Sequence, residues 1–110
     1  NVRWRRIVPI GDTMTLDEIV QDIHALEEDM GTYERKYGVL SETFYTAYAE
    51  GQEPPETAWV ADWNDWAAVH EIWVDRRLRY QSAIETLQKQ TGLIDLIRRA
   101  AHRESIPVPA

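Results

Sequence analysis

Apolar residues recur at alternating intervals of three and four residues in two long stretches of the chain, the spacing of a helical seam. The first seam comprises Leu16, Ile19, Ile23, Leu26, Met30, Tyr33 and Tyr37. The second comprises Trp59, Trp63, Trp66, His70, Trp73, Arg77, Tyr80, Ile84 and Leu87. This pattern predicts an all-α protein built on a long antiparallel hairpin of two helices, at about residues 15–37 and 57–90.

Capping signals define the starts of the first two predicted helices. Thr15 and Glu18 have the spacing of a capping box, in which the hydroxyl and the carboxylate each accept a hydrogen bond from a backbone amide of the first turn. A shorter helix is predicted to follow, with Ser41 as its cap. Leu40 and Tyr45 flank this cap at the positions of a hydrophobic staple, so we expect them to pack together.

Prolines and glycines divide the rest of the chain. Pro54 and Pro55 separate the short helix from the second long one, and Gly92 separates the latter from a last, basic helix that ends near Arg103. The expected organisation is an extended N-terminal arm at residues 1–13, a single helical domain at 14–103 and an extended, proline-containing tail at 104–110. Met14 has the character of a natural start, so the arm is alternatively an upstream extension.

Charge is unevenly distributed along the sequence. The chain has 19 acidic and 12 basic residues and a net charge of −7. Residues 12–75 contain sixteen acids and two bases, and nine of the eleven aromatic residues lie between Tyr33 and Trp73. The flanking segments are basic, with net charges of +3 and +4. An acidic, aromatic body argues against a nucleic-acid or anionic-membrane binder, because phosphate contacts require clustered lysine and arginine.

The sequence offers little for catalysis or metal binding. It contains no cysteine, which excludes disulfides, thiolate zinc sites and cysteine nucleophiles. His24 shares a helical face with Glu27 and Glu28, but the Glu-x-x-His motif of two-metal helical bundles does not occur. Phosphate-binding loops and nucleophile motifs do not occur either. We therefore expect no enzyme activity, no metal and no cofactor. No apolar run is long enough to span a bilayer, so we expect a soluble, cytoplasmic protein.

Four tryptophans, at positions 59, 63, 66 and 73, are the most unusual feature of the second predicted helix. They have two interpretations, as core residues on helical spacing or as anchors of an interface. A seam between two helices rarely has room for four indoles, so we expect two to be buried and the others to line a surface groove or contact. The predicted partner-binding residues are therefore Trp59, Asp62, Trp63, Asp65, Trp66, His70 and Trp73.

His70 and Arg77 are polar residues on an otherwise apolar seam. In the interpretation that we favour, His70 is a core residue whose ring nitrogens bond to a carboxylate or a carbonyl group. Arg77 then pairs with an acid of the first helix, and the two polar residues fix the helix register. In the alternative, both residues lie at a partner interface. The carboxylates at residues 27–29, with Asp62 and Asp65, are expected to be solvated.

Part of the sequence resembles a set of small, acidic, helical bacterial proteins. The most specific stretch runs from Tyr33 to Tyr45 with the pattern Tyr-x-x-x-Tyr-Gly-x-x-Ser-x-x-Phe-Tyr. Met14-Thr15-Leu16-Asp17-Glu18-Ile19 and Asp62-Trp63-Asn64-Asp65-Trp66-Ala67 add to the resemblance, which covers residues 14–87. Members of this set are often encoded beside a small predicted toxin. The resemblance therefore implies an antitoxin that neutralises its toxin by binding.

Charge, aromatic content and resemblance leave two functional hypotheses. In the first, the chain is a non-catalytic interaction module that binds and neutralises a basic protein partner, such as a toxin. In the second, it is a small structural subunit of a larger multiprotein assembly, held by its N-terminal arm and its C-terminal tail. A homodimer is compatible with both hypotheses, because the two seams can pair within one chain or between two chains.

Overall fold

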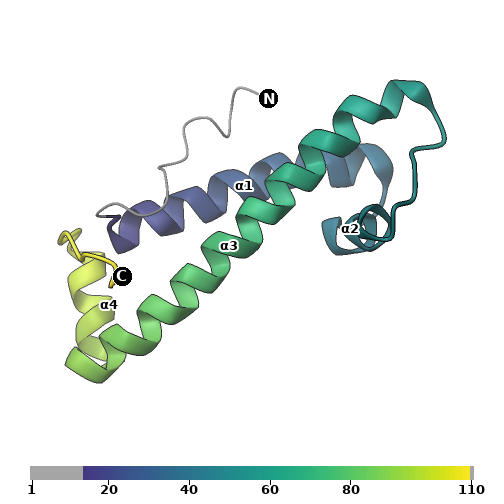
Figure 1. Ribbon diagram of the computed structural model, residues 1–110. Helices are drawn as coiled ribbons and strands as arrows, with labels where there is room; N and C mark the ends of the chain where they lie inside the picture. Colours follow the sequence, from purple (N-terminus) through teal and green to yellow (C-terminus); the bar gives the residue numbers. More distant parts are fainter. Residues whose placement is uncertain (1–13, 110) are drawn as a thin grey trace. The chain divides into compact units, whose positions relative to one another are not determined.

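The computed structural model describes residues 14–109, which are mostly helical (Figure 1). The elements are α1, Leu16–Tyr37; α2, Ser41–Ala49; a short 3-10 helix, Thr57–Trp59; α3, Val60–Thr91; and α4, Leu93–Ala101. The described residues contain no strand beyond an isolated bridge between Thr15 and Pro107. The predicted all-α class and its two long helices are thus confirmed. The predicted arm, at residues 1–13, lies outside the described residues.

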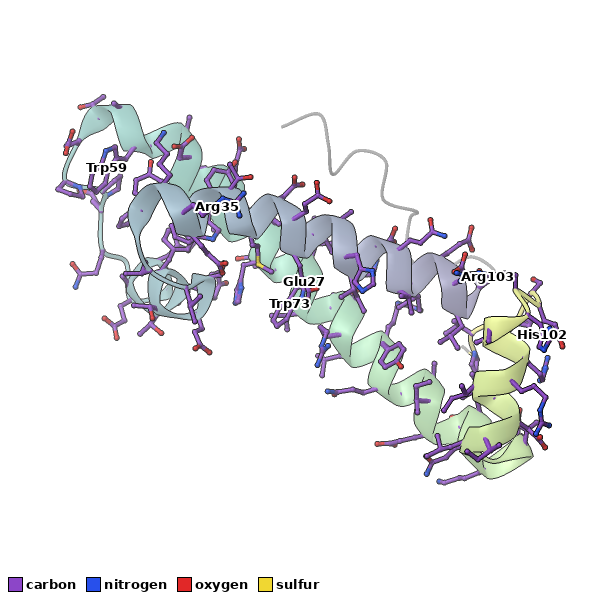
Figure 2. All side chains as sticks on the ribbon, turned by 180° about the vertical axis from the view of Figure 1, so that it is seen from behind. Glu27, Arg35, Trp59, Trp73, His102 and Arg103 are labelled. Atoms are coloured by element: carbon purple, nitrogen blue, oxygen red, sulfur yellow. The ribbon has the colours of Figure 1, made fainter. Side chains whose placement is uncertain are left out.

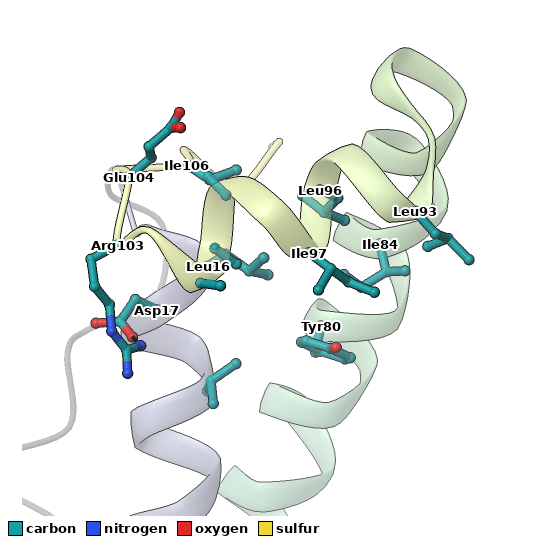
Figure 3. Close-up of a pocket in the computed structure, with 13 residues that line it drawn as sticks. Leu16, Asp17, Tyr80, Ile84, Leu93, Leu96, Ile97, Arg103, Glu104 and Ile106 are labelled. Atoms are coloured by element: carbon teal, nitrogen blue, oxygen red, sulfur yellow. Dashed lines mark hydrogen bonds and ion pairs between the residues drawn. The ribbon is translucent and has the colours of Figure 1, made fainter.

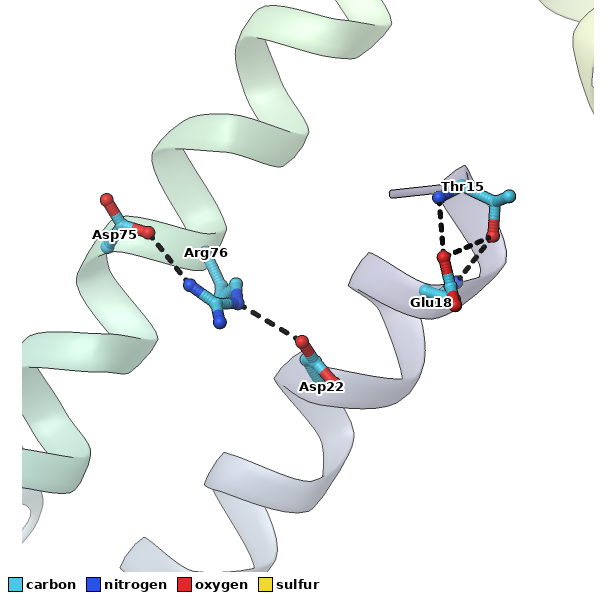
Figure 4. Close-up of polar contacts among 5 residues, drawn as sticks. All are labelled: Thr15, Glu18, Asp22, Asp75 and Arg76. Carbon is cyan, nitrogen blue, oxygen red and sulfur yellow. Dashed lines mark hydrogen bonds and ion pairs between the residues drawn. The ribbon is translucent and has the colours of Figure 1, made fainter. Parts of the chain in front are cut away.

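α1 begins at the predicted capping box (Figure 4). The backbone amide of Thr15 donates to Oε1 of Glu18 over 2.8 Å, and the amide of Glu18 donates to Oγ1 of Thr15 over 3.2 Å. The apolar seam of α1 is buried from Leu16 to Tyr33, as its spacing predicts. After α1 comes Gly38, whose φ of 76° lies in the left-handed region that glycine adopts without strain.

The described residues form two compact units, each of which contains part of α1 and part of α3. Unit 1 comprises residues 25–74, and unit 2 comprises residues 14–24 and 75–109. In unit 1, Glu27 bonds to Trp73 and the later residue Lys36 bonds to the earlier residue Asp62, so the two helix segments run antiparallel. The predicted helical hairpin is confirmed.

Of the predicted seam residues on α3, only Trp66 and Leu87 are buried, and at three positions the buried residue is the one before the predicted one. The predicted seam residues there are His70, Arg77 and Ile84, and the buried residues are their predecessors Val69, Arg76 and Ala83, each 3% exposed or less. At two of these positions an apolar or smaller side chain replaces a polar or larger one, and at the third Arg76 reaches the buried carboxylate of Asp22. The seam of α1 carries large side chains, so the facing helix contributes small ones, such as Ala67 and Ala83, which allow the two layers of side chains to interdigitate.

A buried ion pair links α1 to α3 in unit 2 (Figure 4). Nε of Arg76 donates to Oδ2 of Asp22 over 3.1 Å, and the two side chains are 4% and 8% exposed. Nη1 of Arg76 also donates to Asp75 over 3.0 Å. The favoured interpretation placed such a pair at Arg77, which is exposed. The buried arginine of the seam is Arg76, one residue before the predicted position.

The C-terminal residues complete unit 2. Gly92, with a φ of 81°, separates α3 from α4. The backbone amide of Leu16 donates to the carbonyl of Ile106 over 2.8 Å, and that of Val108 donates to the carbonyl of Met14 over 2.9 Å. These bonds hold the tail beside the start of α1. The core of this unit comprises Leu16, Ala83, Leu87, Leu96 and Ile106.

Replacing a seam residue of α1 should cost much of the stability of unit 2. Ile23 is 6% exposed, so Ile23→Ala is expected to lower the free energy of unfolding by about 2–5 kcal/mol, through lost transfer energy and the cavity left behind. The control is Leu78→Ala, at a side chain that is 61% exposed, with an expected change below about 0.5 kcal/mol. Chemical denaturation followed by circular dichroism measures both, and equal effects would contradict the burial of the seam.

The buried ion pair gives a second prediction. Asp22→Asn leaves the guanidinium of Arg76 buried with one anion fewer, so we expect a loss of about 3 kcal/mol in the free energy of unfolding. The double variant Asp22→Leu, Arg76→Met replaces the pair by apolar side chains and should recover most of that loss. Lys89→Met, which removes a positive charge at an exposed position of α3 in the same unit, is the control. A double variant less stable than Asp22→Asn would refute this account of the pair.

Candidate partner-binding site

The seven predicted partner-binding residues all lie in unit 1, on α3 or on the 3-10 helix before it. The structure does not bring them to one common surface. Trp66 is a core residue, since it is 1% exposed. Its ring stacks on Phe44 at a centroid distance of 3.9 Å and an interplanar angle of 2°. Among the described tryptophans it is the only buried one, so the expectation of two buried indoles was wrong.

Ser41 connects this core to the neighbouring helices. Its hydroxyl accepts a hydrogen bond from Nε1 of Trp66 over 2.8 Å and donates to Oε2 of Glu34 over 2.7 Å. Its backbone amide donates to the same carboxylate oxygen over 2.9 Å. The predicted cap was wrong, because the N-cap of α2 is Leu40 and makes no side-chain cap bond. The predicted staple to Tyr45 is not supported either, since Leu40 is 61% exposed. A glutamate of α1 therefore caps the first turn of α2.

Trp59 and Asp62 contact the last turn of α1. Trp59 packs edge-on against Tyr37 with ring centroids 5.1 Å apart. Oδ2 of Asp62 accepts hydrogen bonds from Nζ of Lys36 over 2.6 Å and from the hydroxyl of Tyr37 over 2.7 Å. The bond from Lys36, followed by that from Tyr37, lowers the pKa of Asp62. Desolvation, together with the bond to Asp62, raises the pKa of Tyr37 to about 12. Asp62 is thus a structural anion and not the freely solvated one that was expected.

Trp63 faces α2 and the proline-containing connector. It packs edge-on against Phe44 with ring centroids 5.2 Å apart. It also lines a pocket of about 480 Å³ whose other walls include Pro54 and Pro55. Asp65, two residues further along α3, is half-buried, so it is not fully solvated as expected. Trp63 therefore presents a partly apolar surface that is separate from the surroundings of Trp59.

His70 and Trp73 line a second pocket, of about 300 Å³, with residues of α1 and the start of α2. Nε1 of Trp73 donates to Oε2 of Glu27 over 3.2 Å, which places the indole beside α1 (Figure 2). Leu40 contributes an exposed apolar side chain. Among the described residues no lysine or arginine lines this pocket, and its acidic members are Glu27, Glu34 and Glu42. The pocket therefore combines an aromatic wall with uncompensated negative charge.

The ring of His70 is half-buried in this aromatic group. Its centroid lies 4.7 Å from that of Tyr45 and 5.8 Å from that of Trp73. Nδ1 is buried and has no hydrogen-bond partner within residues 14–109, so the favoured interpretation, in which a carboxylate or carbonyl group bonds to the ring nitrogens, was wrong for this atom. Desolvation lowers the pKa of His70 despite the opposing effect of nearby glutamates such as Glu71. His70 is therefore a neutral aromatic ring at neutral pH.

The negative charge of the described residues resides in unit 1. Eleven acidic and two basic residues give this unit a net charge of −9. The described residues of unit 2 carry seven acids and seven bases and are neutral overall. The acidic body predicted from the sequence thus becomes one acidic unit that contains all seven candidate residues. The carboxylates at residues 27–29 are only partly solvated as expected, because Asp29 is 3% exposed.

Sequence reasoning missed most of the pocket. Glu27 and Glu34 are one heptad apart and therefore share a face of α1 beside its apolar seam. That spacing was visible in the sequence and could have marked a shared acidic face. The contribution of Leu40 could not have been found in this way, because its exposure depends on Glu34 capping α2 from another helix.

Neither a metal centre nor a membrane-spanning helix is found in the described part of the chain. Residues 14–109 hold no group of three or more His, Asp, Glu or Cys side chains arranged to bind a metal ion. Of the helices they form, none combines the length and the apolar composition needed to cross a bilayer. Comparison of the chain with protein-family models, with curated proteins and with solved structures gave no match. The basis for a functional proposal is therefore the site itself.

His70 makes the stability depend on pH. Its pKa is lowered from 6.5 in the folded state, so the unfolded chain binds a proton first as the pH falls. The free energy of unfolding should therefore decrease as the pH falls below about 7, through the ordinary histidine pKa of 6.5. His70→Gln should remove this decrease, whereas His24→Gln, at an exposed position, should leave it unchanged. Denaturation at a series of pH values tests this, and an unchanged pH slope in His70→Gln would refute it.

Proposed function

We propose that the chain is a non-catalytic interaction module that binds a basic protein through unit 1 and neutralises it, as an antitoxin does. The observation that carries the proposal is the pocket of His70 and Trp73, in which three glutamates meet an indole without a basic residue among those described. Carboxylates form strong charge-assisted hydrogen bonds with guanidinium and ammonium groups. An indole face attracts the same cations through its quadrupole. The pocket thus suits a lysine or arginine side chain of a partner.

The surroundings of the pocket favour such a cation further. The neutral ring of His70 adds no positive charge that would compete with it. Both hydrogen bonds made by Glu34 to Ser41 use Oε2, so its other carboxylate oxygen can accept a bond from a partner. A net charge of −9 on unit 1 raises the rate at which a basic protein associates, and this steering weakens as salt is added.

The pocket at Trp63 supplies a complementary contact. Its walls include an indole and two prolines, and Val60 beside them is 44% exposed. Such walls suit an apolar side chain of the same partner. Interfaces commonly combine apolar anchors with a charged, hydrated rim, and their binding energy is concentrated in a few aromatic and arginine residues. Unit 1 offers both kinds of contact.

The second hypothesis, a structural subunit held by its arm and tail, is not favoured by any observation on residues 14–109. The tail from Ile106 to Val108 bonds to the start of α1, and Ile106 is 2% exposed. A tail that is bound to the start of α1 cannot also attach the chain to a larger assembly unless it first detaches from unit 2.

The test uses the product of the gene next to the one that encodes this chain. The expected result is that this product is basic, stops growth when expressed alone, and is neutralised and bound when the two are co-expressed. Its dissociation constant, measured by calorimetry, should rise with salt concentration. A neighbour that is harmless alone and does not bind this chain would overturn the proposal.

Two charge reversals then test the pocket. Glu42→Lys, in the pocket, should weaken binding by about tenfold or more, equivalent to about 1.4 kcal/mol. Glu50→Lys is the matched control, because it makes the same change of net charge at an exposed position of unit 1 outside the pocket. It should change binding by less than about threefold. Equal losses in the two variants would show that only overall charge matters and would contradict the role of the pocket.

A further inference from the structure

We infer that unit 2 binds a second copy of this chain through an apolar groove beside α4. The inference is independent of the function proposed for unit 1, because it rests on a different surface. The groove has a volume of about 480 Å³ and lies where α4 meets the start of α1 and the end of α3 (Figure 3). Its main apolar lining consists of Leu16, Val20, Tyr80, Ile84, Leu93 and Ile97.

α4 has a wider apolar face than unit 2 covers. At about 100° per residue, its apolar side chains span an arc of about 160°, and its charged residues occupy the remainder. Leu96, at one edge of the arc, is 3% exposed. Leu93, Ile94 and Ile97 are 49%, 71% and 62% exposed. A helix of nine residues thus exposes three large apolar side chains next to an apolar groove, which marks an interaction surface.

This surface has the features that pairing with itself requires. A two-fold interface is isologous, so one patch must carry both members of every complementary pair. Exposed isoleucines of α4 lie beside the hollow that could receive them. The rim also carries both signs of charge in exposed ion pairs: Arg103, with its side chain 81% exposed, pairs with Asp17 over 3.3 Å, and Glu104 pairs with Arg99 over 3.0 Å. A two-fold axis can therefore place a cation of one copy opposite an anion of the other.

Other surfaces suit a second copy less well. Pairing through unit 1 would oppose two surfaces that each belong to a unit of charge −9, whereas the described residues of unit 2 are neutral overall. Pairing through the seam of α1, compatible with the sequence, would require uncovering residues from Leu16 to Tyr33 that are buried within the units. The exposed apolar face of α4 requires no such rearrangement.

The first test is the mass of the full chain in solution as a function of concentration. Analytical ultracentrifugation should give twice the chain mass at high concentration and the chain mass on dilution. Ile97→Glu should abolish this dimer, because it would bury an unpaired carboxylate. Leu40→Glu is the matched control, since Leu40 is 61% and Ile97 62% exposed, and its dimer should persist. A chain that stays monomeric at every concentration, or a dimer that survives Ile97→Glu, would overturn the inference.

A second test introduces no charge, so it remains valid even if the Ile97→Glu variant does not fold. The chain has no cysteine, so Ile97→Cys and Leu40→Cys each introduce a unique thiol. Maleimide labelling of the thiol at position 97 should slow at least severalfold as protein concentration rises, whereas labelling at position 40 should not change. Slow labelling at position 97 at every concentration would mean that the same chain covers the groove. Fast labelling at every concentration would mean that the face is bare. Either result would overturn the inference.

Discussion

The indole of Trp66 is the point at which the three helices of unit 1 meet. It stacks on Phe44 of α2, and its N–H donates to Ser41, whose hydroxyl donates in turn to Glu34 of α1. A buried indole N–H without an acceptor would cost about 1–3 kcal/mol, so these two hydrogen bonds fix where α2 begins against the other helices. The pocket proposed to bind a cation depends on this arrangement, because Glu34, Ser41 and Glu42 all line it. Trp66 is buried and cannot contact a partner, but its contacts position the residues of the pocket that a partner would bind.

In unit 2 a buried ion pair fixes the position of one helix against another, as the hydrogen-bonded indole of Trp66 does in unit 1. Arg76 of α3 and Asp22 of α1 are nearly fully buried, and a slip of the two helix segments would separate them. Such a pair adds little net stability over apolar residues, but it penalises alternative registers, as a polar residue does in a coiled-coil seam. Each unit thus holds a buried polar link between helices, and in both cases the link joins α1 to another helix.

Features that depend on residues close together in the sequence were predicted correctly. Features that depend on contacts between helices were not. The capping box and the seam of α1 were predicted correctly, because both depend on spacing within one helix. The buried residues of α3 were displaced by one at three positions, among them Arg76 in place of Arg77, because they depend on the side chains that α1 presents, such as Asp22. The cap of α2 failed for a similar reason, since Glu34 lies on a different helix from the turn that it caps. The acidic pocket shows both outcomes: its indole was predicted, and its glutamates were not.

The acidic pocket and the apolar groove lie in different units, and this separation affects what each unit can bind. An acidic surface attracts a basic partner over a distance of about a Debye length and loses strength in salt, whereas an apolar groove acts only on contact and is not screened by salt. The two proposed contacts therefore do not compete for the same chemistry. A dimer formed through unit 2 would carry two copies of the acidic pocket. For a partner that is itself a dimer and reaches both pockets at once, the second contact would become intramolecular, and binding would strengthen without any new interaction at the pocket.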